Sequence, residues 1–523
     1  MPGVSCTPGT LCTSDARYIT TPLRAHVARL TAHGAGSAPP RLMLLFLVAG
    51  AALGICPLFH AKNSCPAVRP PECDISYDSQ QGMARAARDD LLRKGWRARE
   101  GLLRFTSGHM YGQNPQSRYG LFEFNDTLIE DMPLWTLGPA DAIFWIGCTP
   151  PPLEYFSMRS YVWLSNGTNL FASLGDAANN LRFNSTGGPT SPGNINRTAS
   201  MIVSGDLTSG ATVASALQSA GLPAGAINHD WMPPALLRMR RSQWTTVDEG
   251  YMLVYRVSLF EDKRQEERYV NSSWPVYMMW APRGAPTEPA PVPVQRARGT
   301  GTSERMLAPS VDALVGLANA TMARARYALA QTVRLSPIDI EGVLDCIPHN
   351  RQCGGDNRDA AYFSDRVATY TLPDDASFLL VVGVNHNASG KATYGNVVVE
   401  TLPKPDAGVF NLTDNGQFGA DSRAFEGTAD AFARGQPLPT DKLFAAAIAR
   451  NCSALEEELR PALAPHGELR LCLELPEKLR TQRKPPLLRV VTRAYLEPET
   501  KTGPAYDELT WPHVLRFRRE GAA

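Results

Sequence analysis

The stretch Phe378–Val384, with the sequence FLLVVGV, carries the clearest buried-strand signal in the chain. A continuous apolar run of strand length, rich in valine, is typical of a strand that is covered on both faces. It leads directly into Asn385-His386-Asn387, so polar side chains stand where the strand ends. That position matters because ligands of open α/β sheets bind beyond the carboxyl ends of the strands.

Other apolar runs predict further strands, at Asp141–Gly147, Ser160–Leu164, Met201–Ser204, Tyr251–Phe260, Val276–Trp280, Asn396–Leu402 and Leu487–Leu496. We interpret Asn396–Leu402 (NVVVETL) as a partner strand of Phe378–Val384. Apolar residues that recur every three to four positions predict helices. These are expected at Gln80–Leu103, Gly210–Ala220 and Val311–Val333, with a helical pattern through residues 424–460.

The segment after Met201–Ser204 indicates half of a βαβ unit. The strand runs into a Gly-Asp turn, and Asp206, Thr208 or Ser209 is suited to cap the helix that follows. Short buried strands that alternate with helices predict an α/β or mixed α+β fold. We expect this fold to form a globular ectodomain behind one N-terminal apolar helix.

Residues 281–305 interrupt this pattern, because they are rich in Pro and Gly and nearly devoid of apolar bulk. Ala281–Glu304 reads APRGAPTEPAPVPVQRARGTGTSE. Such composition predicts an extended, solvated linker or a long surface insertion. It separates a first globular half, residues 60–280, from a second, residues 306–523.

The apolar helix is expected at Leu42–Phe59 (LMLLFLVAGAALGICPLF), which contains no charge. Eighteen residues lie near the lower limit for crossing a bilayer, roughly 17–25 residues. The preceding tail, residues 1–41, is basic, and positive charge keeps that flank cytoplasmic. We therefore predict a type II signal anchor of the secretory pathway or cell surface. A cleaved signal peptide and an organellar transit peptide remain alternatives, and they predict a secreted or an organellar protein.

Nine Asn-X-Ser/Thr acceptors follow the apolar segment and none precedes it. This excess predicts passage through the secretory pathway and N-glycans on surface loops. The acceptors are Asn125, Asn166, Asn184, Asn196, Asn271, Asn319, Asn387, Asn411 and Asn451.

Seven of the ten cysteines also follow the apolar segment. Close spacing suggests disulfides of Cys65 with Cys73, Cys346 with Cys353 and Cys452 with Cys472, which suits an oxidising compartment. The count is odd, and Cys148 is the cysteine without a near neighbour. We therefore treat Cys148 as a candidate nucleophile. Burial, or pairing with a distant cysteine, is the alternative.

Composition narrows the function classes. The chain is 43% hydrophobic and 20% charged with a net charge of +1. This balance gives no support for a nucleic-acid partner, which requires a clustered basic face. The sequence contains no G-x-S-x-G, H-E-x-x-H, P-loop or EF-hand motif. We expect neither a metal nor an organic cofactor.

His386 is the first candidate for chemistry, because it closes the Phe378–Val384 run. It can act as a general base, with Lys391 or Tyr394 contacting an anionic substrate. The alternative is a hydrogen-bonded loop histidine beside a glycan on Asn387. Asp206 is a candidate orienter or second acid/base, although it is also suited to a helix cap.

A second group of candidates lies in the run EYFSMRSY. Tyr155, Ser157, Arg159 and Tyr161 share one face if the run is a strand, because strand side chains alternate. Arg159 on such a face can bind a carboxylate or a phosphate. The alternative is an ordinary solvated strand face.

Two functions follow from these candidates. The first is a membrane-anchored, N-glycosylated lumenal or extracellular hydrolase or transferase that acts on a small polar or anionic substrate. The second is a non-catalytic glycoprotein ectodomain for binding or adhesion. The enzyme requires His386, Asp206 and Arg159 to surround one pocket, whereas the ectodomain tolerates their separation.

Overall fold

The computed structural model describes residues 72–521, except for 107–113, 125–127, 130–131, 189–192, 240–248, 339–345, 356, 366–369, 403–416, 434 and 464–466. The predicted basic tail and the predicted anchor Leu42–Phe59 lie outside the described residues. So do Cys65 and two of the nine acceptor asparagines, Asn125 and Asn411.

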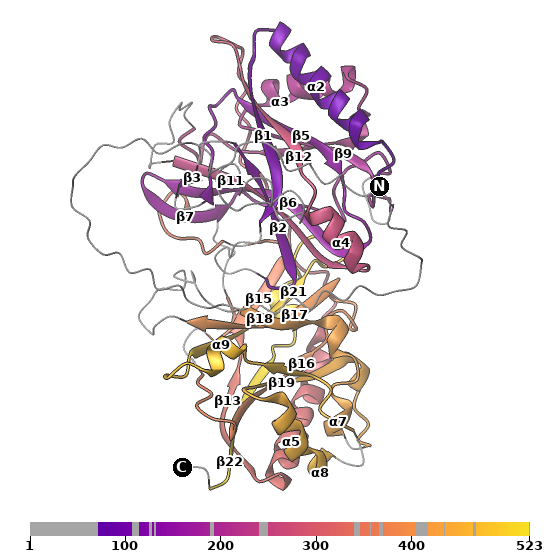
Figure 1. Cartoon of the computed structure of the whole chain (residues 1–523), viewed down its shortest axis with the longest axis vertical. Helices are drawn as coiled ribbons and strands as arrows, with labels where there is room; N and C mark the ends of the chain where they lie inside the picture. Colours follow the sequence, from indigo (N-terminus) through magenta and orange to yellow (C-terminus); the bar gives the residue numbers. More distant parts are fainter. Residues whose placement is uncertain are drawn as a thin grey trace, which may run out of the picture. The chain divides into compact units, whose positions relative to one another are not determined.

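Ten of the described strands before residue 281 form one sheet, ordered β10-β9-β5-β12-β1-β2-β11-β6-β7 with β8 beside β6; Figure 1 shows most of these strands. Their bounds are β1 Arg97–Thr106, β2 Ser117–Glu123, β5 Ala142–Cys148, β6 Leu153–Ser165, β7 Thr168–Ser173, β8 Ala178–Asn179, β9 Thr198–Ser204, β10 Ile227–Trp231, β11 Glu249–Phe260 and β12 Trp274–Trp280. A separate small ribbon pairs β3 (Leu128–Ile129) with β4 (Met132–Pro133).

This sheet curls until strands near its opposite ends touch. Asp230 on the edge strand β10 accepts hydrogen bonds from Arg159 Nη1 (2.5 Å) and from the backbone N–H of Ser160 (2.6 Å), both on β6. Curling encloses an aromatic core that includes Trp145 and Trp274. The right-handed twist of strands makes such curling the usual outcome for a sheet of this width.

Among the described residues, three α-helices accompany the first sheet, and two of them cover part of one face. They are α2 (Tyr77–Arg93), α3 (Leu207–Ser219) and α4 (Lys263–Val270). Buried residues of α2 and α3 pack on β5, β9 and β12 around Phe144 and Ile202. Strand β9, helix α3 and strand β10 form a βαβ unit, because β10 pairs parallel to β9. The predicted half-unit is thus confirmed, with Asp206 as the cap of α3.

The remaining strands form two five-stranded sheets, ordered β13-β22-β16-β19-β20 and β14-β15-β21-β17-β18. Their bounds are β13 Tyr327–Arg334, β14 Ser336–Pro337, β15 Ala360–Ser364, β16 Ser377–Val384, β17 Tyr394–Leu402, β18 Gln417–Asp421, β19 Leu443–Ala449, β20 Cys472–Glu474, β21 Leu487–Tyr495 and β22 His513–Arg519. The helices here are α5 (Ala308–Arg324), α7 (Asp430–Ala433), α8 (Cys452–Leu463) and α9 (Glu477–Arg480).

Strand β16 is covered on both faces, as its sequence predicts. Leu379 and Val381 pack between the two five-stranded sheets, against residues of β17 and β21. The alternate residues Leu380 and Val382 pack with residues of α5, α7 and α8. The chain therefore has a mixed α/β fold in which strands predominate, which confirms the coarse prediction of fold class.

Two predicted helix boundaries are wrong, and each error has a local cause. The expected helices Gln80–Leu103 and Val311–Val333 end at Arg93 and Arg324, and strands β1 and β13 follow them. In both cases the chain turns through a residue with positive φ, Gly95 or Arg326, which ends a helix. Sequence periodicity alone did not mark these turns.

Two strand assignments also need correction. Within residues 424–460, Leu443–Ala449 (LFAAAIA) is the strand β19, because pairing with β16 overrides the helix propensity of alanine. The interpretation of Asn396–Leu402 as a partner strand of Phe378–Val384 is also wrong. This segment, β17, pairs with β18 and β21 in the opposite sheet and not with β16.

Three disulfides join described cysteines. The pairs Cys346–Cys353 and Cys452–Cys472 confirm the prediction. Cys73 pairs with Cys148, so the predicted pair of Cys65 with Cys73 is wrong, and the alternative that Cys148 pairs with a distant cysteine is confirmed. Folding brings Cys148, at the end of β5, beside the chain that precedes α2. Such bonds are typical of proteins of an oxidising extracellular or lumenal environment.

Among the described residues, one helical stretch, Glu304–Arg324, meets simple length and hydropathy criteria for a membrane span. Its inner face, with Val311, Leu314 and Met322, packs into the core beside β16. Core helices meet the same criteria, so the stretch is weak evidence for a membrane span.

The Cys73–Cys148 bond closes a loop of 75 residues, whereas Cys346–Cys353 closes a loop of 7. Because a longer closed loop restricts the unfolded chain more, replacing Cys73 and Cys148 by Ser should lower the free energy of unfolding by about 4 kcal/mol. The matched replacement of Cys346 and Cys353 should cost about 2 kcal/mol. Denaturant titrations of both variants measure the difference. Equal losses, or thiol labelling of Cys148 in the native protein, would contradict the assignment.

Candidate functional site

The Pro-rich segment is an ordered strap, which we define as residues 281–304. Near its start it pairs with the turn before α3. The backbone N–H of Leu207 donates to Glu288 O (2.7 Å), and that of Ala290 donates to Gly205 O (2.8 Å). Asp206 accepts from the backbone N–H of Glu288. The strap thus contacts the same turn that begins the βαβ helix.

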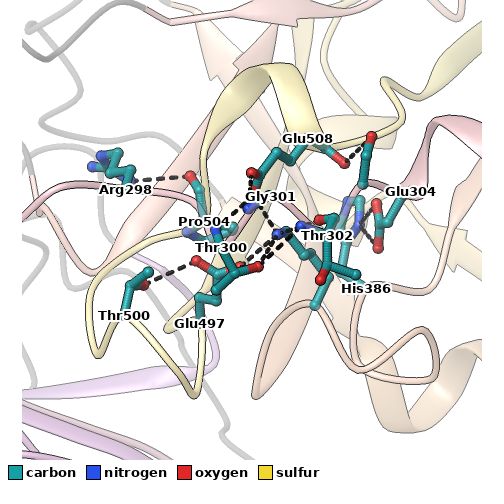
Figure 2. Close-up of polar contacts among 12 residues, drawn as sticks. Arg298, Thr300, Gly301, Thr302, Glu304, His386, Glu497, Thr500, Pro504 and Glu508 are labelled. Atoms are coloured by element: carbon teal, nitrogen blue, oxygen red, sulfur yellow. Dashed lines mark hydrogen bonds and ion pairs between the residues drawn. The ribbon is translucent and has the colours of Figure 1, made fainter.

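The far end of the strap lies against the loop that carries His386 (Figure 2). The same loop carries Lys391, which also contacts the strap. Lys391 Nζ is 2.5 Å from Glu497 Oε1 and 2.5 Å from Glu508 Oε2. It also donates to the carbonyl of Thr302 (2.6 Å). Only 5% of the Lys391 side chain is exposed, so two carboxylates balance a nearly buried ammonium.

His386 makes a second ion pair at this end. Its Nδ1 lies 2.8 Å from Glu304 Oε2, and both side chains are buried. Ser389 Oγ and the backbone N–H of Thr510 also donate to the Glu304 carboxylate. Burial opposes ionisation, but the charge and hydrogen bonds of His386, Ser389 and Thr510 outweigh it and lower the pKa of Glu304.

We call Glu304, His386, Lys391, Glu497 and Glu508 the strap-end cluster. A surface pocket of about 330 Å³ lies beside it, lined by Glu304, Lys391, Ser389, Glu497 and the strap residues Thr300 and Thr302, among others. Folding therefore brings two predicted site residues, His386 and Lys391, to one place. Both already have protein partners, which suits a structural role.

Asp206 is not part of this cluster. Its Oδ1 accepts from the backbone N–H of Ser209 (2.7 Å), which is the geometry of a helix N-cap. Its Oδ2 accepts from the strap at Glu288. The described contacts thus give Asp206 two structural partners and do not include His386. Cys148, in its disulfide, has no free thiol.

Tyr155 and Ser157 belong to a buried polar network and not to a solvated face. The Tyr155 hydroxyl lies 2.6 Å from Ser157 Oγ and 2.9 Å from Asp359 Oδ2. Asn179 Nδ2 donates to Asp359 Oδ1 (2.8 Å). Burial raises the pKa of Asp359 to about 6 although these donors oppose it. Burial also raises the pKa of Tyr155, so its phenol remains a donor.

Tyr394 lies next to Tyr155 in space, although the two residues are far apart in the sequence. Its ring stacks on Tyr495 with centroids 4.4 Å apart, and the Tyr155 ring is 5.9 Å away. Asn114 Nδ2 donates to the Tyr394 hydroxyl (3.2 Å). These aromatic and amide contacts join the ten-stranded sheet to β17 and β21, which explains their burial.

Arg159, a predicted site residue, lines a pocket of the first sheet. The pocket, which we call the arginine pocket, has a volume of about 230 Å³. Arg159, on β6, and Asp230, on β10, both line it. The remaining lining is mostly polar and comprises Met158, Asp176, Ala178, Arg182, Asn184, Ile227, Asn228 and His229.

Sequence reasoning missed the partners that define these sites. Glu304 stands in the Pro-rich segment that was expected to be solvated, and Asp230 and Asp359 follow no recognised motif. Each meets its partner across more than 70 residues of chain. A charged residue at a strand end was the available signal, and Asp230 in INHDW fits it. Within the described parts of the chain, no group of three or more His, Cys, Asp or Glu is arranged to hold a metal ion.

Comparison with known proteins adds little. No protein-family model and no curated protein matches the chain. Among solved structures, the chain is similar to an uncharacterised protein from Burkholderia cenocepacia, with 11% identity, a TM-score of 0.35, and coverage of 85% of this chain and 88% of that chain. It is also similar to the VPA0106 protein from Vibrio parahaemolyticus, with 10% identity, a TM-score of 0.35, and coverage of 84% and 97%. Likenesses at this level carry no conclusion about function.

The Glu304–His386 pair predicts a loss of stability in acid. Because the folded pKa of Glu304 lies below its ordinary value of 4.5, its contribution is present above pH 4.5 and is lost as the pH falls through the folded pKa. Glu304→Gln should lower the free energy of unfolding at pH 7 by about 2–3 kcal/mol and weaken this acid dependence. Urea titrations at pH 3–7 measure both effects. Glu457→Gln, at an exposed glutamate, is the control, and an equal effect there would refute the assignment.

The buried carboxyl group of Asp359 should give the opposite pH dependence of stability. Its folded pKa, about 6, lies above the ordinary 3.8, so its contribution is complete below pH 3.8 and is lost as the pH rises through 6. Asp359→Asn should therefore flatten the fall in stability between pH 4 and pH 7. Thermal melts across this range test the effect, with the exposed Asp441→Asn as control. An unchanged pH profile in Asp359→Asn would show that this carboxyl titrates normally.

Proposed function

We propose that this chain is a glycoprotein of the secretory pathway, anchored in the membrane by Leu42–Phe59, whose ectodomain is a non-catalytic binding module. The observation that carries the proposal is the fate of the candidate catalytic groups. Asp206 caps a helix, Cys148 is in a disulfide, and His386 is paired with Glu304. Arg159 lines a different pocket. The described contacts therefore do not bring together His386, Asp206 and Arg159, which the enzyme hypothesis requires around one pocket.

The disulfides support the compartment. Three described pairs join cysteines 7 to 75 residues apart, and such bonds persist in oxidising surroundings. A type II topology accounts for them, because it places everything after the anchor on the lumenal or extracellular side.

The acceptor asparagines support glycosylation. Seven of the nine are described, and none of these seven is buried. Asn166, Asn271 and Asn387 are exposed, and Asn166 stands in the Asn-Gly turn between β6 and β7. Accidental acceptors would fall in the core as readily as other asparagines, such as Asn179, which is buried. Surface positions are what a bulky glycan requires.

A hydrolase or transferase for a small polar or anionic substrate is the second candidate. The pair of His386 with Glu304 favours it, because a carboxylate that orients an imidazole is a recurrent part of catalytic sites. Ser389, however, donates to the carboxylate, and the His386 side chain is 6% exposed. The binding module therefore accounts better for these contacts.

Expression in a eukaryotic host tests the proposal. Endoglycosidase treatment should shift the protein to lower apparent mass, and the ectodomain should resist added protease in sealed microsomes. Asn271→Gln and Asn387→Gln should each remove one glycan. Asn350→Gln, at an exposed asparagine outside any acceptor motif, should change nothing. An unshifted band, with the bulk of the chain open to protease, would overturn both the compartment and the topology.

A further inference from the structure

The arginine pocket lies where the first sheet closes on itself, and its base is a guanidinium with incomplete pairing. Arg159 is 6% exposed. Its Nη1 is paired with Asp230, whereas its buried Nε and Nη2 have no hydrogen-bond partner among the described residues. A buried donor without a partner costs free energy, so a site that keeps one is a candidate for a ligand that supplies the acceptor.

A glycine stands directly beside this guanidinium. Gly175 has φ +121°, and a Cβ there would lie 3.4 Å from Arg159 Nη2 and 3.1 Å from Pro293 Cγ of the strap. Glycine therefore allows the β7 end, the strap and the arginine to approach one another closely. A few residues further along the strap, the backbone N–H of Arg296 donates a hydrogen bond to Asp176 Oδ2 (2.8 Å).

Two arginines and two aspartates line the pocket, and the carboxylates are unequally shared. Arg159 pairs with Asp230, and Arg358 Nε pairs with Asp176 Oδ1 at 2.8 Å. Arg182 Nη1 is 3.7 Å from Asp176 Oδ2 and, among the described residues, donates to the carbonyl of Ala177 (3.4 Å). Arg182 therefore shares Asp176 with Arg358, so its guanidinium is the group of the lining that a ligand carboxylate can pair with.

The rest of the lining is suited to hydroxyl groups. Asn228 uses its amide to hold the backbone of Asn184 and Ser200, which fixes the wall. Asn184 itself also lines the pocket. His229 is exposed, and its ring stacks on Trp231 with centroids 4.7 Å apart and planes 13° apart. Partial desolvation of the imidazole by its neighbours lowers the pKa of His229, so it offers a neutral aromatic face.

We propose that the arginine pocket binds a small hydroxylated monocarboxylate of the sugar-acid class, such as a hexuronic acid. Its carboxylate pairs with Arg182 and completes the hydrogen bonding of Arg159, because guanidinium groups bind carboxylates through paired N–H donors. Its hydroxyls contact Asn184 and the pocket carboxylates, and its ring lies near His229. This inference deepens the proposed binding function by naming the ligand class and the residues that read it.

Asn184 is also a glycan acceptor, and a glycan on it would stand at the pocket. The binding test therefore uses the ectodomain, residues 67–523, which forms one compact unit, produced in the bacterial periplasm. There disulfides form and eukaryotic N-glycans are not added. The same protein carrying glycans should bind the ligand more weakly if Asn184 is occupied.

Isothermal titration calorimetry with D-glucuronate is the measurement. We expect one site per chain, with D-glucose and inorganic phosphate at least about ten-fold weaker, because glucose lacks the charge and phosphate lacks the ring. Arg182→Gln should weaken D-glucuronate binding about ten-fold or more, since one charge-assisted pair is lost. Arg93→Gln, at an exposed arginine of α2, should bind as the wild type does.

Arg182 is half-exposed, so Arg182→Gln is expected to fold, and circular dichroism melts verify this. His229→Ala provides a second variant that removes the ring face and keeps the charge. The proposal is overturned by absence of heat at millimolar D-glucuronate, by equal affinity for D-glucose, by tighter binding of phosphate, or by wild-type affinity in folded Arg182→Gln. If the protein binds D-glucuronate but carries no glycan in eukaryotic cells, the proposed secretory-pathway location is wrong and the proposed ligand of the arginine pocket is supported.

Discussion

The fold of the first half depends on the buried carboxylate of Asp230. Ten strands of one sheet leave two edges, and an open edge exposes unpaired N–H and C=O groups. Asp230 on β10 meets Arg159 and the Ser160 N–H on β6, so one side chain joins strands that stand near opposite ends of the sheet. Both side chains of this ion pair are almost fully buried. Loss of one partner in such a pair typically costs about 3–5 kcal/mol, because the other charge stays buried.

That same closure creates the arginine pocket. A guanidinium has five N–H donors in a planar fork, and one carboxylate cannot satisfy them all. Asp230 divides its oxygens between Arg159 and a backbone N–H, which leaves two nitrogens of Arg159 without partners among the described residues. The ion pair that closes the sheet and the candidate ligand site are therefore two consequences of the same geometry. A bound carboxylate would stabilise the closed sheet as well as fill the pocket.

The strap links these features to the second half of the chain. Its backbone pairs with the turn of Asp206 at one end, passes the arginine pocket at Pro293 and Arg296, and ends in the ion pair of Glu304 with His386 (Figure 2). A segment without helix or apolar bulk has little hydrophobic burial to order it. Ion pairs and backbone hydrogen bonds replace that contribution here. His386 and Lys391 are thus explained by the segment that they hold.

The sequence by itself determined the local elements. Apolar runs located β5, β9, β11, β12, β16 and β21, because a strand buried on both faces must be continuously apolar. Asp206 was foreseen as a cap, since its role depends only on residues within one turn of it. Two of the three disulfides also followed from close spacing. What these predictions share is that the decisive partner lies within about twenty residues along the chain.

Only the tertiary structure decided which distant residues meet. Pairing of β19 with β16 overrode its alanine-rich pattern, and β17 joined the opposite sheet although it follows β16 closely. Cys148 met Cys73, Asp359 met Tyr155, and Glu304 met His386, in each case across a long stretch of chain. Curling of the sheet brings Asp230 next to Arg159, and no local sequence pattern predicts this curling. Burial, charge pairing and the arginine pocket arise from these long-range contacts, because the free energy of a buried charge depends on the groups that surround it in space.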